Sequence, residues 1–180
     1  GNVTDVVTTA GALAAIRVDG SVATGGHGTA GGNSTKVALD LSGGVITLSA
    51  TRGAFAALLE NRNVVCWGND LSYNWDLTDY GGWCSSLASQ LRCVNRIVAT
   101  ARAFAALKSD GSVVSWGDSE FGGDSSGRDL SSGIITIVSD DSAFAALKND
   151  GSVVSWGSTS FGGDSSSVTS DLASGVIALF

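Results

Sequence analysis

Few side chains of this 180-residue sequence have the types and spacing that catalysis or cofactor binding requires. His27 is the only histidine, so no triad with a His base and no multi-His metal site can be assembled. Residues 26–31 match G-x-G-x-x-G by letters, but a Gly, Asn, Ser and Thr loop follows instead of the helix that receives pyrophosphate. Residues 123–127 match a nucleophile elbow, yet their copy 40 residues later lacks the final Gly. We therefore expect no enzyme and no cofactor.

The residues best suited to contact a partner lie in one insertion, mostly between residues 67 and 80 and continuing to residue 84. Tyr and Trp embedded in polar and acidic residues add large apolar area with a hydrogen-bonding edge, as protein contact surfaces do. The same composition suits stacking against a glycan, and a self-packed loop is the third alternative. The candidate contact residues are Tyr73, Trp75, Asp76, Tyr80 and Trp83.

The acidic residues of the same insertion are weak candidates for a calcium site. Asp70, Asp76 and Asp79 supply carboxylates, but their spacing fits no standard calcium loop. Zinc is also disfavoured, since the three cysteines lack paired C-x-x-C spacing and no histidine is near. We expect no bound metal.

The cysteines indicate a disulfide, although the pairing stays open. Cys84 and Cys93 are nine residues apart and could close a loop, which makes them the candidate pair. Cys66 occupies the position of Ser115 and Ser155 on a predicted strand, so it is either free or paired with one of the other two. A disulfide implies an oxidising compartment.

Two glycosylation acceptor patterns begin at Asn2 and Asn33. Together with the cysteines they favour a secreted or cell-surface protein.

The composition excludes several classes of partner. The chain is 43% apolar, which suffices for a packed core, and its 10 Lys+Arg against 17 Asp+Glu give a net charge of −7. An acidic chain without a basic cluster is a poor ligand for nucleic acid or an anionic membrane surface. Its apolar runs are far shorter than the roughly 20 residues of a membrane helix, so we expect no membrane span.

The elements that must position these residues come from an internal repeat. Residues 103–127 and 143–167 are identical at 20 of 25 positions, and weaker copies begin earlier. The predicted units are 2–43, 44–92, 93–132 and 133–174, with spacings of 42, 49, 40 and 42 residues, and a fifth unit begins at 175–180. The sequence thus ends in mid-repeat.

Each unit has the local signals of short strands. The opening segments, such as residues 134–138, are β-branched and too short for a stable helix. The segments that begin Ala-Phe-Ala-Ala-Leu favour helix by propensity, but they are only six residues long with the residue that follows, and they lead into an Asp-Gly hairpin turn. The Val-Val-Ser-Trp segments are β-branched and aromatic. A fourth, outer strand has only a weak signal.

These units predict an all-β fold of β-propeller blades. Three or four strands in about 40 residues, repeated without helices, suit a blade, and small Ala side chains let neighbouring blades approach. A parallel β-helix is the main rival, but its coils are shorter and lack a hairpin at each Asp-Gly. Four units and the first strand of a fifth predict a partial propeller, or one that other chains complete.

The repeat resembles that of the regulator of chromosome condensation and β-lactamase inhibitor protein II superfamily. The resemblance lies in Val/Ile-x-x-Ile/Val followed by Ala-Leu-Lys-x-Asp-Gly-x-Val-x-x-Trp-Gly, and the 40-residue spacing is closer to the secreted branch. It implies a propeller. Phe55, Phe104 and Phe144 stand where the family often has His, and Gly25 stands where it has Trp. The usual seven blades are not present.

The fifth opening strand favours association, because an unpaired strand edge invites pairing. We expect a section of a longer array, or a subunit that adds a strand to its neighbour.

The functional hypothesis is a non-enzymatic, extracellular β-propeller scaffold that binds protein partners as a structural subunit of a larger assembly. A glycan-binding propeller and an inhibitor of a secreted enzyme are the alternatives, and the nucleotide-exchange role of the family's nuclear branch is disfavoured by the predicted disulfide.

Overall fold

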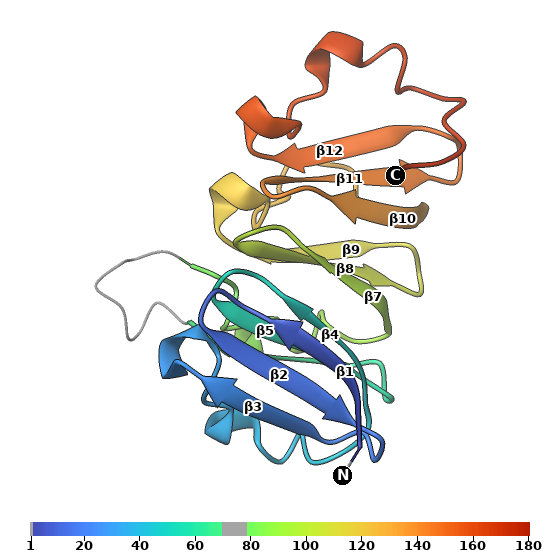
Figure 1. The fold of residues 1–180 in the computed structure, drawn as a ribbon. Coiled ribbons are helices and arrows are strands. Elements are labelled where there is room, and N and C mark those ends of the chain that lie inside the picture. Colours follow the sequence, from blue (N-terminus) through green and yellow to red (C-terminus); the bar gives the residue numbers. More distant parts are fainter. Residues whose placement is uncertain (1, 70–78) are drawn as a thin grey trace.

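The computed structural model describes residues 2–69 and 79–180, which form four three-stranded antiparallel sheets arranged as blades (Figure 1). Blade 1 contains β1 (Val3–Thr8), β2 (Ala12–Arg17) and β3 (Val22–Gly26), and blade 2 contains β4 (Val45–Ala50), β5 (Ala54–Leu59) and β6 (Val64–Gly68). Blade 3 contains β7 (Val94–Ala99), β8 (Ala103–Lys108) and β9 (Val113–Gly117), and blade 4 contains β10 (Ile134–Ser139), β11 (Ala143–Lys148) and β12 (Val153–Gly157). The predicted all-β blade fold is confirmed.

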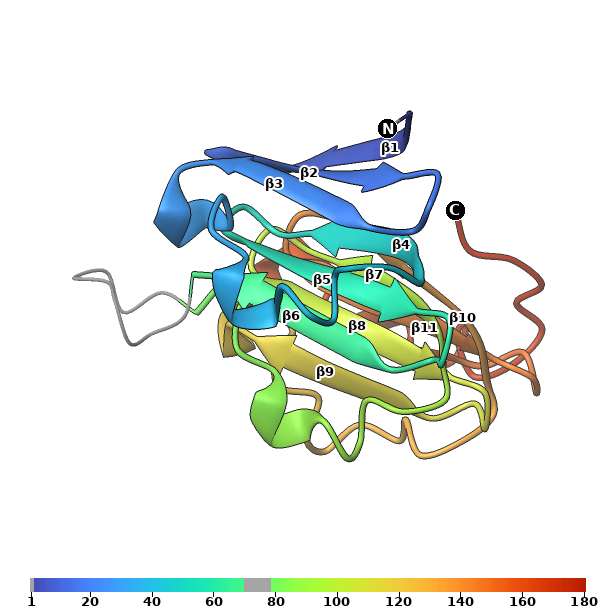
Figure 2. The same cartoon turned by 90° about the horizontal axis from the view of Figure 1, so that it is seen from below.

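Short 3₁₀ helices follow the third strand of each blade. They are η1 (Gly28–Ala30), η2 (Thr35–Val37), η3 (Ser85–Leu87), η4 (Ser119–Phe121), η5 (Thr159–Phe161) and η6 (Ser166–Val168). Figures 1 and 2 show the loops that leave the third strands at one end of the blades and the hairpins between second and third strands at the other. No α-helix occurs in the described ranges, and none of their helices could cross a membrane.

The Ala-Phe-Ala-Ala-Leu segments are strands because both of their faces are buried between blades. In β8, Ala103 and Ala105 pack with residues of blade 4, whereas Phe104 and Ala106 pack with residues of blade 2. All four side chains are fully buried. Alternation of this kind requires the two-residue period of a strand, so packing overrides the helix propensity of Ala and Leu.

The apolar cores lie between successive blades rather than inside one blade. Each of the three clusters combines residues of two neighbouring blades. At each boundary a Phe of the second strand stacks on a Trp of the third strand, with ring centroids 5.1 to 5.2 Å apart; the pairs are Phe55–Trp67, Phe104–Trp116 and Phe144–Trp156.

A hydrogen bond fixes each aromatic pair to the preceding blade. The indole N–H groups of Trp67, Trp116 and Trp156 donate to backbone carbonyls of the preceding loops at 3.0 to 3.1 Å. The acceptors are Gly31, Gly81 and Gly122, whose positive φ values of 97°, 79° and 93° require glycine.

The fifth unit starts like the others but does not form a strand. The backbone N–H of Val176 donates to the carbonyl of Gly151 at 3.0 Å, as Val45 does to Gly20. Residues 175–180 belong to no sheet. The expected first strand of the fifth unit is therefore corrected to an unpaired segment. The four blades do not close into a ring, and no fourth strand extends them in the described ranges.

Candidate functional site

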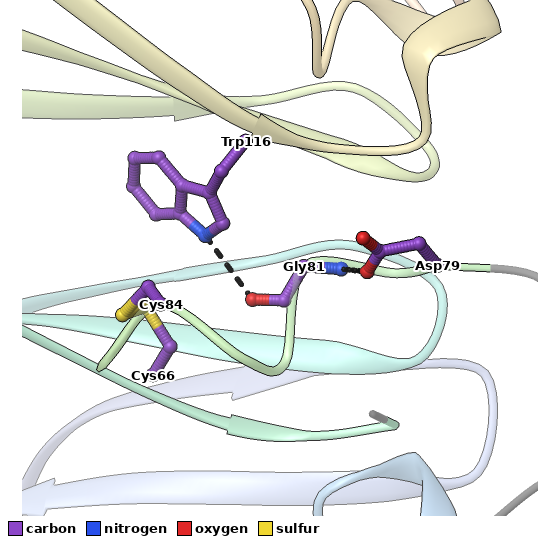
Figure 3. Close-up of a disulfide and its surroundings, with 5 residues drawn as sticks. All are labelled: Cys66, Asp79, Gly81, Cys84 and Trp116. Atoms are coloured by element: carbon purple, nitrogen blue, oxygen red, sulfur yellow. Dashed lines mark hydrogen bonds between the residues drawn. A yellow bond between two sulfur atoms is a disulfide. The ribbon is translucent and has the colours of Figure 1, made fainter. Parts of the chain in front are cut away.

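The disulfide joins Cys66 on β6 to Cys84 in the loop that follows it (Figure 3). Their Cα atoms are 5.8 Å apart, within the usual range for a disulfide. Cys93 is free and exposed. The predicted Cys84–Cys93 bridge is therefore wrong, whereas the alternative that Cys66 pairs with one of the other two is confirmed. The reason is that Cys93 starts the next blade, while the loop after β6 folds back onto Cys66.

The cysteine pair stands where another blade has two hydroxyl side chains. In blade 1, Thr24 occupies the position of Cys66 and Ser34 that of Cys84, and their oxygens are 2.9 Å apart. In blades 3 and 4 the equivalent Ser115 and Ser155 also bond back to their loops, and their hydroxyls donate to the carbonyls of Gly123 and Gly163 at 3.4 Å. A contact between strand and loop thus recurs, and blade 2 makes it covalent.

A groove of about 610 Å³ lies beside the disulfide, between the loops of blades 1 and 2. Its walls come from residues 28–37 of blade 1 and from residues 66–69 and 82–85 of blade 2. That volume is within the range of small-molecule and peptide-side-chain sites. Because Cys66 and Cys84 both line it, the disulfide holds two walls of the groove together.

Trp83 is the exposed aromatic residue of the groove. Its side chain is 58% exposed, although a Trp usually buries most of its surface. The ammonium of Lys36 lies 6.0 Å from the centre of its ring, at the outer limit for a cation–π contact. Lys36 is the only charged residue among the groove residues that the structure describes.

Asn69 also lines the groove, but its side-chain oxygen is buried. Its residue surface is only 5% exposed, and its Oδ1 has no hydrogen-bond partner in the part of the chain that the structure describes. A buried, unpaired acceptor costs free energy unless a ligand or water pairs with it. Because this oxygen has almost no accessible surface, the features that the groove presents to a ligand are the Trp83 ring and the Lys36 ammonium beside it.

Tyr80 and Asp79, the other aromatic and acidic candidates that the structure describes, do not line the groove. Tyr80 is half-buried, and its ring packs on Gly53, where an added Cβ would lie 2.8 Å from the Tyr80 Cγ. Asp79 accepts a 2.7 Å hydrogen bond from the backbone N–H of Gly81, which shapes the turn (Figure 3). Candidates Tyr73, Trp75 and Asp76, and also Asp70, lie outside the described residues.

The two predicted glycosylation asparagines are both exposed. The Asn33 Oδ1 accepts hydrogen bonds from the backbone N–H and hydroxyl of Thr35, at 3.1 and 2.7 Å. Asn33 also lines the groove, so a glycan attached there would enter it. Modification of Asn2 and Asn33 stays a prediction.

The best-defined carboxylates lie at the opposite end of the blades, in the Asp-Gly-Ser hairpins. Asp110 accepts hydrogen bonds from the backbone N–H and the hydroxyl of Ser112 at 2.9 and 2.6 Å. These bonds lower the pKa of Asp110 to about 2, and the same contacts lower the pKa of Asp19 and Asp150. No group of three or more metal-ligating side chains occurs in residues 2–69 and 79–180.

Sequence reasoning left the partner of Cys66 open and missed the role of the recurring glycines. Aligning the loops through Gly31, Gly81 and Gly122 places Cys84 opposite Ser34, which is the signal for the pairing. The eight additional residues between Cys66 and Cys84, compared with Thr24 and Ser34, concealed that alignment.

Comparison with solved structures supports the blade assignment. Human WBSCR16 matches with a TM-score of 0.53 and 19% identity, over 87% of this chain and 48% of that structure. Yeast RCC1 (Prp20) matches with a TM-score of 0.55 and 19% identity, over 86% of this chain and 42% of that structure. The ectodomain of receptor kinase CR4 from Physcomitrella patens matches with a TM-score of 0.51 and 15% identity, over 86% and 40%.

The chain spans less than half the length of these three structures. No protein-family model matches the sequence, and neither does any curated protein. At 15 to 19% identity the likeness concerns the fold. The resemblance drawn from the repeats is thereby confirmed at that level: the chain has the blade fold of RCC1-like β-propellers.

Proposed function

We propose that this chain is a non-enzymatic, extracellular β-propeller scaffold that binds a protein partner as a structural subunit of a larger assembly. The observation that carries the proposal is Trp83, a 58%-exposed Trp beside a groove of about 610 Å³. A large aromatic side chain on a rigid wall is the kind of residue that dominates binding energy at protein interfaces.

Two features support the extracellular setting. The Cys66–Cys84 disulfide joins positions that carry hydroxyl groups in blade 1, and disulfides persist in oxidising compartments. The CR4 structure with the same blade fold is the ectodomain of a receptor kinase. RCC1-like structures also include yeast RCC1 bound to Kap60, which supports a protein as the partner class.

The test uses a photo-crosslinking amino acid at position 85, an exposed position that also lines the groove, in the full chain. Crosslinking identifies a partner, which is then purified and titrated against the unmodified chain and Trp83→Ala by calorimetry. We expect Trp83→Ala to weaken binding about 30-fold or more, as loss of a hot-spot side chain does. Val18→Ala, an equally simple truncation of a 69%-exposed residue outside the groove, should bind unchanged. Equal affinity of the three proteins would refute the proposal.

A glycan is the second candidate for the groove, because its lining combines the exposed Trp83 ring with hydroxyl side chains such as Thr35 and Ser85. Sugars stack on aromatic faces and donate hydroxyl groups to such acceptors. A glycan array separates the two candidates: a hit that Trp83→Ala abolishes assigns the groove to sugar. An inhibitor of a secreted enzyme is the remaining alternative, and a partner with enzymatic activity that the chain blocks through Trp83 would identify it.

A further inference from the structure

The junction between the β5–β6 hairpin and the start of β7 differs from the three equivalent junctions of the chain. At each junction the backbone N–H of a unit's first apolar residue donates to a carbonyl of the preceding hairpin, at 2.9 to 3.0 Å. That carbonyl belongs to a glycine in the other units but to Arg62 here. The residue before the N–H donor is also a glycine elsewhere, but it is Cys93 here. Both positions of this junction therefore carry side chains that the repeat otherwise leaves out.

Side chains at these two positions strain the backbone. Arg62 and Cys93 have φ values of 64° and 56°, and no other non-glycine residue of the described ranges has a positive φ. A Cβ added to the equivalent Gly20 or Gly111 would lie 2.7 or 2.9 Å from the backbone nitrogen of the glycine opposite. Outliers of this kind concentrate at sites where function requires the side chain. The strain therefore points to a role for the residues of this junction.

The junction also gathers arginines that the sequence keeps apart. Arg62 is 30 residues from Arg92, but the hydrogen bond from the Val94 N–H to the Arg62 carbonyl brings their segments together, at the hairpin end of the blades (Figure 1). Arg92 precedes Val94 by two residues and Arg96 follows it by two, and two residues span at most about 7 Å. All three arginines are exposed. Arg62, Arg92 and Arg96 thus form an arginine patch.

The arginine patch differs from the other cationic residues in its side-chain contacts. In residues 2–69 and 79–180 no side-chain partner is assigned to its three arginines, nor does an ion pair join them to Glu60 of the same hairpin. Each of the other seven among the ten Lys and Arg residues contacts a carboxylate, a hydroxyl, a carbonyl or an aromatic ring. Lys108, opposite Val94 in the ladder, is paired with Asp110 at 3.4 Å, so these two charges offset each other. The patch therefore stays net positive in a chain of net charge −7.

The hairpin of the patch also lacks the carboxylate that the other hairpins carry. Asn61 stands where the other three hairpins have an aspartate such as Asp110. The Asn61 Oδ1 accepts a hydrogen bond from the backbone N–H of Asn63 at 3.0 Å, as the Asp110 carboxylate does from Ser112 at 2.9 Å. The turn thus needs a side-chain oxygen at this position but no negative charge. A neutral Asn keeps the turn and does not repel an anion at the patch.

We propose that the arginine patch binds a carboxylate-rich segment of a protein partner. Guanidinium groups donate paired hydrogen bonds that match the geometry of a carboxylate. A long polyanion such as nucleic acid would extend beyond the patch over the rest of an acidic chain, which repels it. A short acidic segment avoids that repulsion, because salt screens exposed charges beyond about 8 Å. The patch lies at the hairpin end of the blades and the Trp83 groove at the loop end, so this is a second site.

The experiment titrates the full chain into a fluorescein-labelled Glu-Glu-Asp-Glu-Glu peptide and follows fluorescence anisotropy, with Gln-Gln-Asn-Gln-Gln as the neutral control peptide. The acidic peptide should bind saturably, and more weakly as the salt concentration rises, whereas the neutral peptide should not bind. Arg92→Gln and Arg96→Gln should each weaken binding about threefold, as loss of one exposed ion pair does. Arg52→Gln is the matched control and should bind like the native chain, because Arg52 is exposed at the opposite end of the blades and pairs with Asp141.

Two further variants separate binding from folding. Arg62→Gly removes a charge and also a side chain at positive φ, so it should weaken peptide binding about threefold while it raises the urea midpoint. An arginine that only supports the hairpin would instead lower the midpoint when it is replaced. Asn61→Asp should weaken binding because it places a carboxylate in the patch, and it should keep the turn that Asp110 forms in blade 3.

Cys93 supplies a local readout, since its thiol is free and exposed next to Arg92. Bound acidic peptide should slow the alkylation of Cys93 by iodoacetamide, a neutral reagent. The proposal is overturned if the acidic peptide does not bind, binds all variants equally or leaves the alkylation rate unchanged. Tighter binding of a heparin fragment or a single-stranded oligonucleotide, with the same dependence on the three arginines, would also overturn it. Trp83→Ala should bind the peptide normally, so failure of this proposal and failure of the groove proposal are distinguishable.

Discussion

Trp156 of blade 4 donates its indole N–H to the carbonyl oxygen of Gly122 in blade 3, at 3.1 Å. The Phe144 ring, stacked on Trp156 with centroids 5.1 Å apart, lies against the same glycine. One residue without a side chain therefore receives both aromatic rings of the next blade. The same arrangement recurs at Gly31 and Gly81, so the stability of the blade stack depends on these glycines.

Gly122→Ala should destabilise the protein more than Gly162→Ala does. Both substitutions place a Cβ at a positive φ, which costs about 1 kcal/mol. Only the Cβ at position 122 also collides with Phe144, at 2.6 Å, whereas the position of Gly162 is open. Overpacking adds about 1–3 kcal/mol. Urea unfolding measures both losses of stability, and equal losses would contradict the role assigned to Gly122.

The disulfide should stabilise blade 2 by about 3 kcal/mol, given the 18-residue separation of its cysteines. The double variant Cys66→Ser/Cys84→Ser replaces the disulfide with two hydroxyls, as in the Thr24 and Ser34 pair of blade 1. The single variant Cys84→Ser instead leaves the Cys66 thiol opposite one hydroxyl. The double variant should therefore lose less stability than the single variant. Chemical unfolding of the three proteins measures these differences.

Tryptic mapping checks the pairing directly. Residues 63–92 form one peptide that contains both Cys66 and Cys84, and residues 93–96 form another that contains Cys93. Without reduction, the first peptide should carry an internal disulfide and the second should be alkylated at Cys93. Two peptides joined by a disulfide would instead indicate a Cys84–Cys93 bridge.

The Asp-Gly-Ser hairpins should make the protein lose stability in acid. The pKa of Asp110 falls from 3.8 to about 2 on folding, because its carboxylate accepts two hydrogen bonds from Ser112. A lowered pKa means that the unfolded chain binds the proton more readily, so this stabilisation is complete above about pH 4 and is lost as the pH falls towards 2.

Asp110→Asn should weaken that dependence because it removes the titrating group. The urea midpoint is compared at pH 7, 4 and about 2 for the native chain, Asp110→Asn and Asp40→Asn, an exposed control outside the hairpins. A native-like pH profile in Asp110→Asn would show that the hairpin carboxylate contributes nothing to acid sensitivity.

The strands were predictable because three of the four units contain Ala-Phe-Ala-Ala and three contain an Asp-Gly turn. The sheet boundaries at Ala103 and Gly117 follow the repeat closely. The contacts between blades were not predictable in the same way. The bond from Trp116 to Gly81 spans 35 residues, and no local pattern marks a glycine as its acceptor.

The candidate site was only partly predictable for a related reason. Aromatic composition identified Trp83, but the same rule also selected Tyr80, whose ring packs on Gly53. Composition does not distinguish an exposed ring from one that fills a gap beside a glycine. Asn69 carried no signal, since only its burial without a hydrogen-bond partner sets it apart.

Cys93→Gly should stabilise the protein by about 1 kcal/mol, because Cys93 has a φ of 56° in a position that the next units fill with Gly133 and Gly175. The thiol is exposed and free, so its removal costs no packing and no disulfide. Cys93→Ser is the matched control: it also removes the thiol but keeps a Cβ at positive φ, so its stability should equal that of the native chain. The reciprocal substitution Gly133→Ala should lose about as much as Cys93→Gly gains, since its φ is 78°. Thermal unfolding of the three variants measures the differences, and a destabilised Cys93→Gly would show that the cysteine side chain contributes more than the strain it imposes on the backbone.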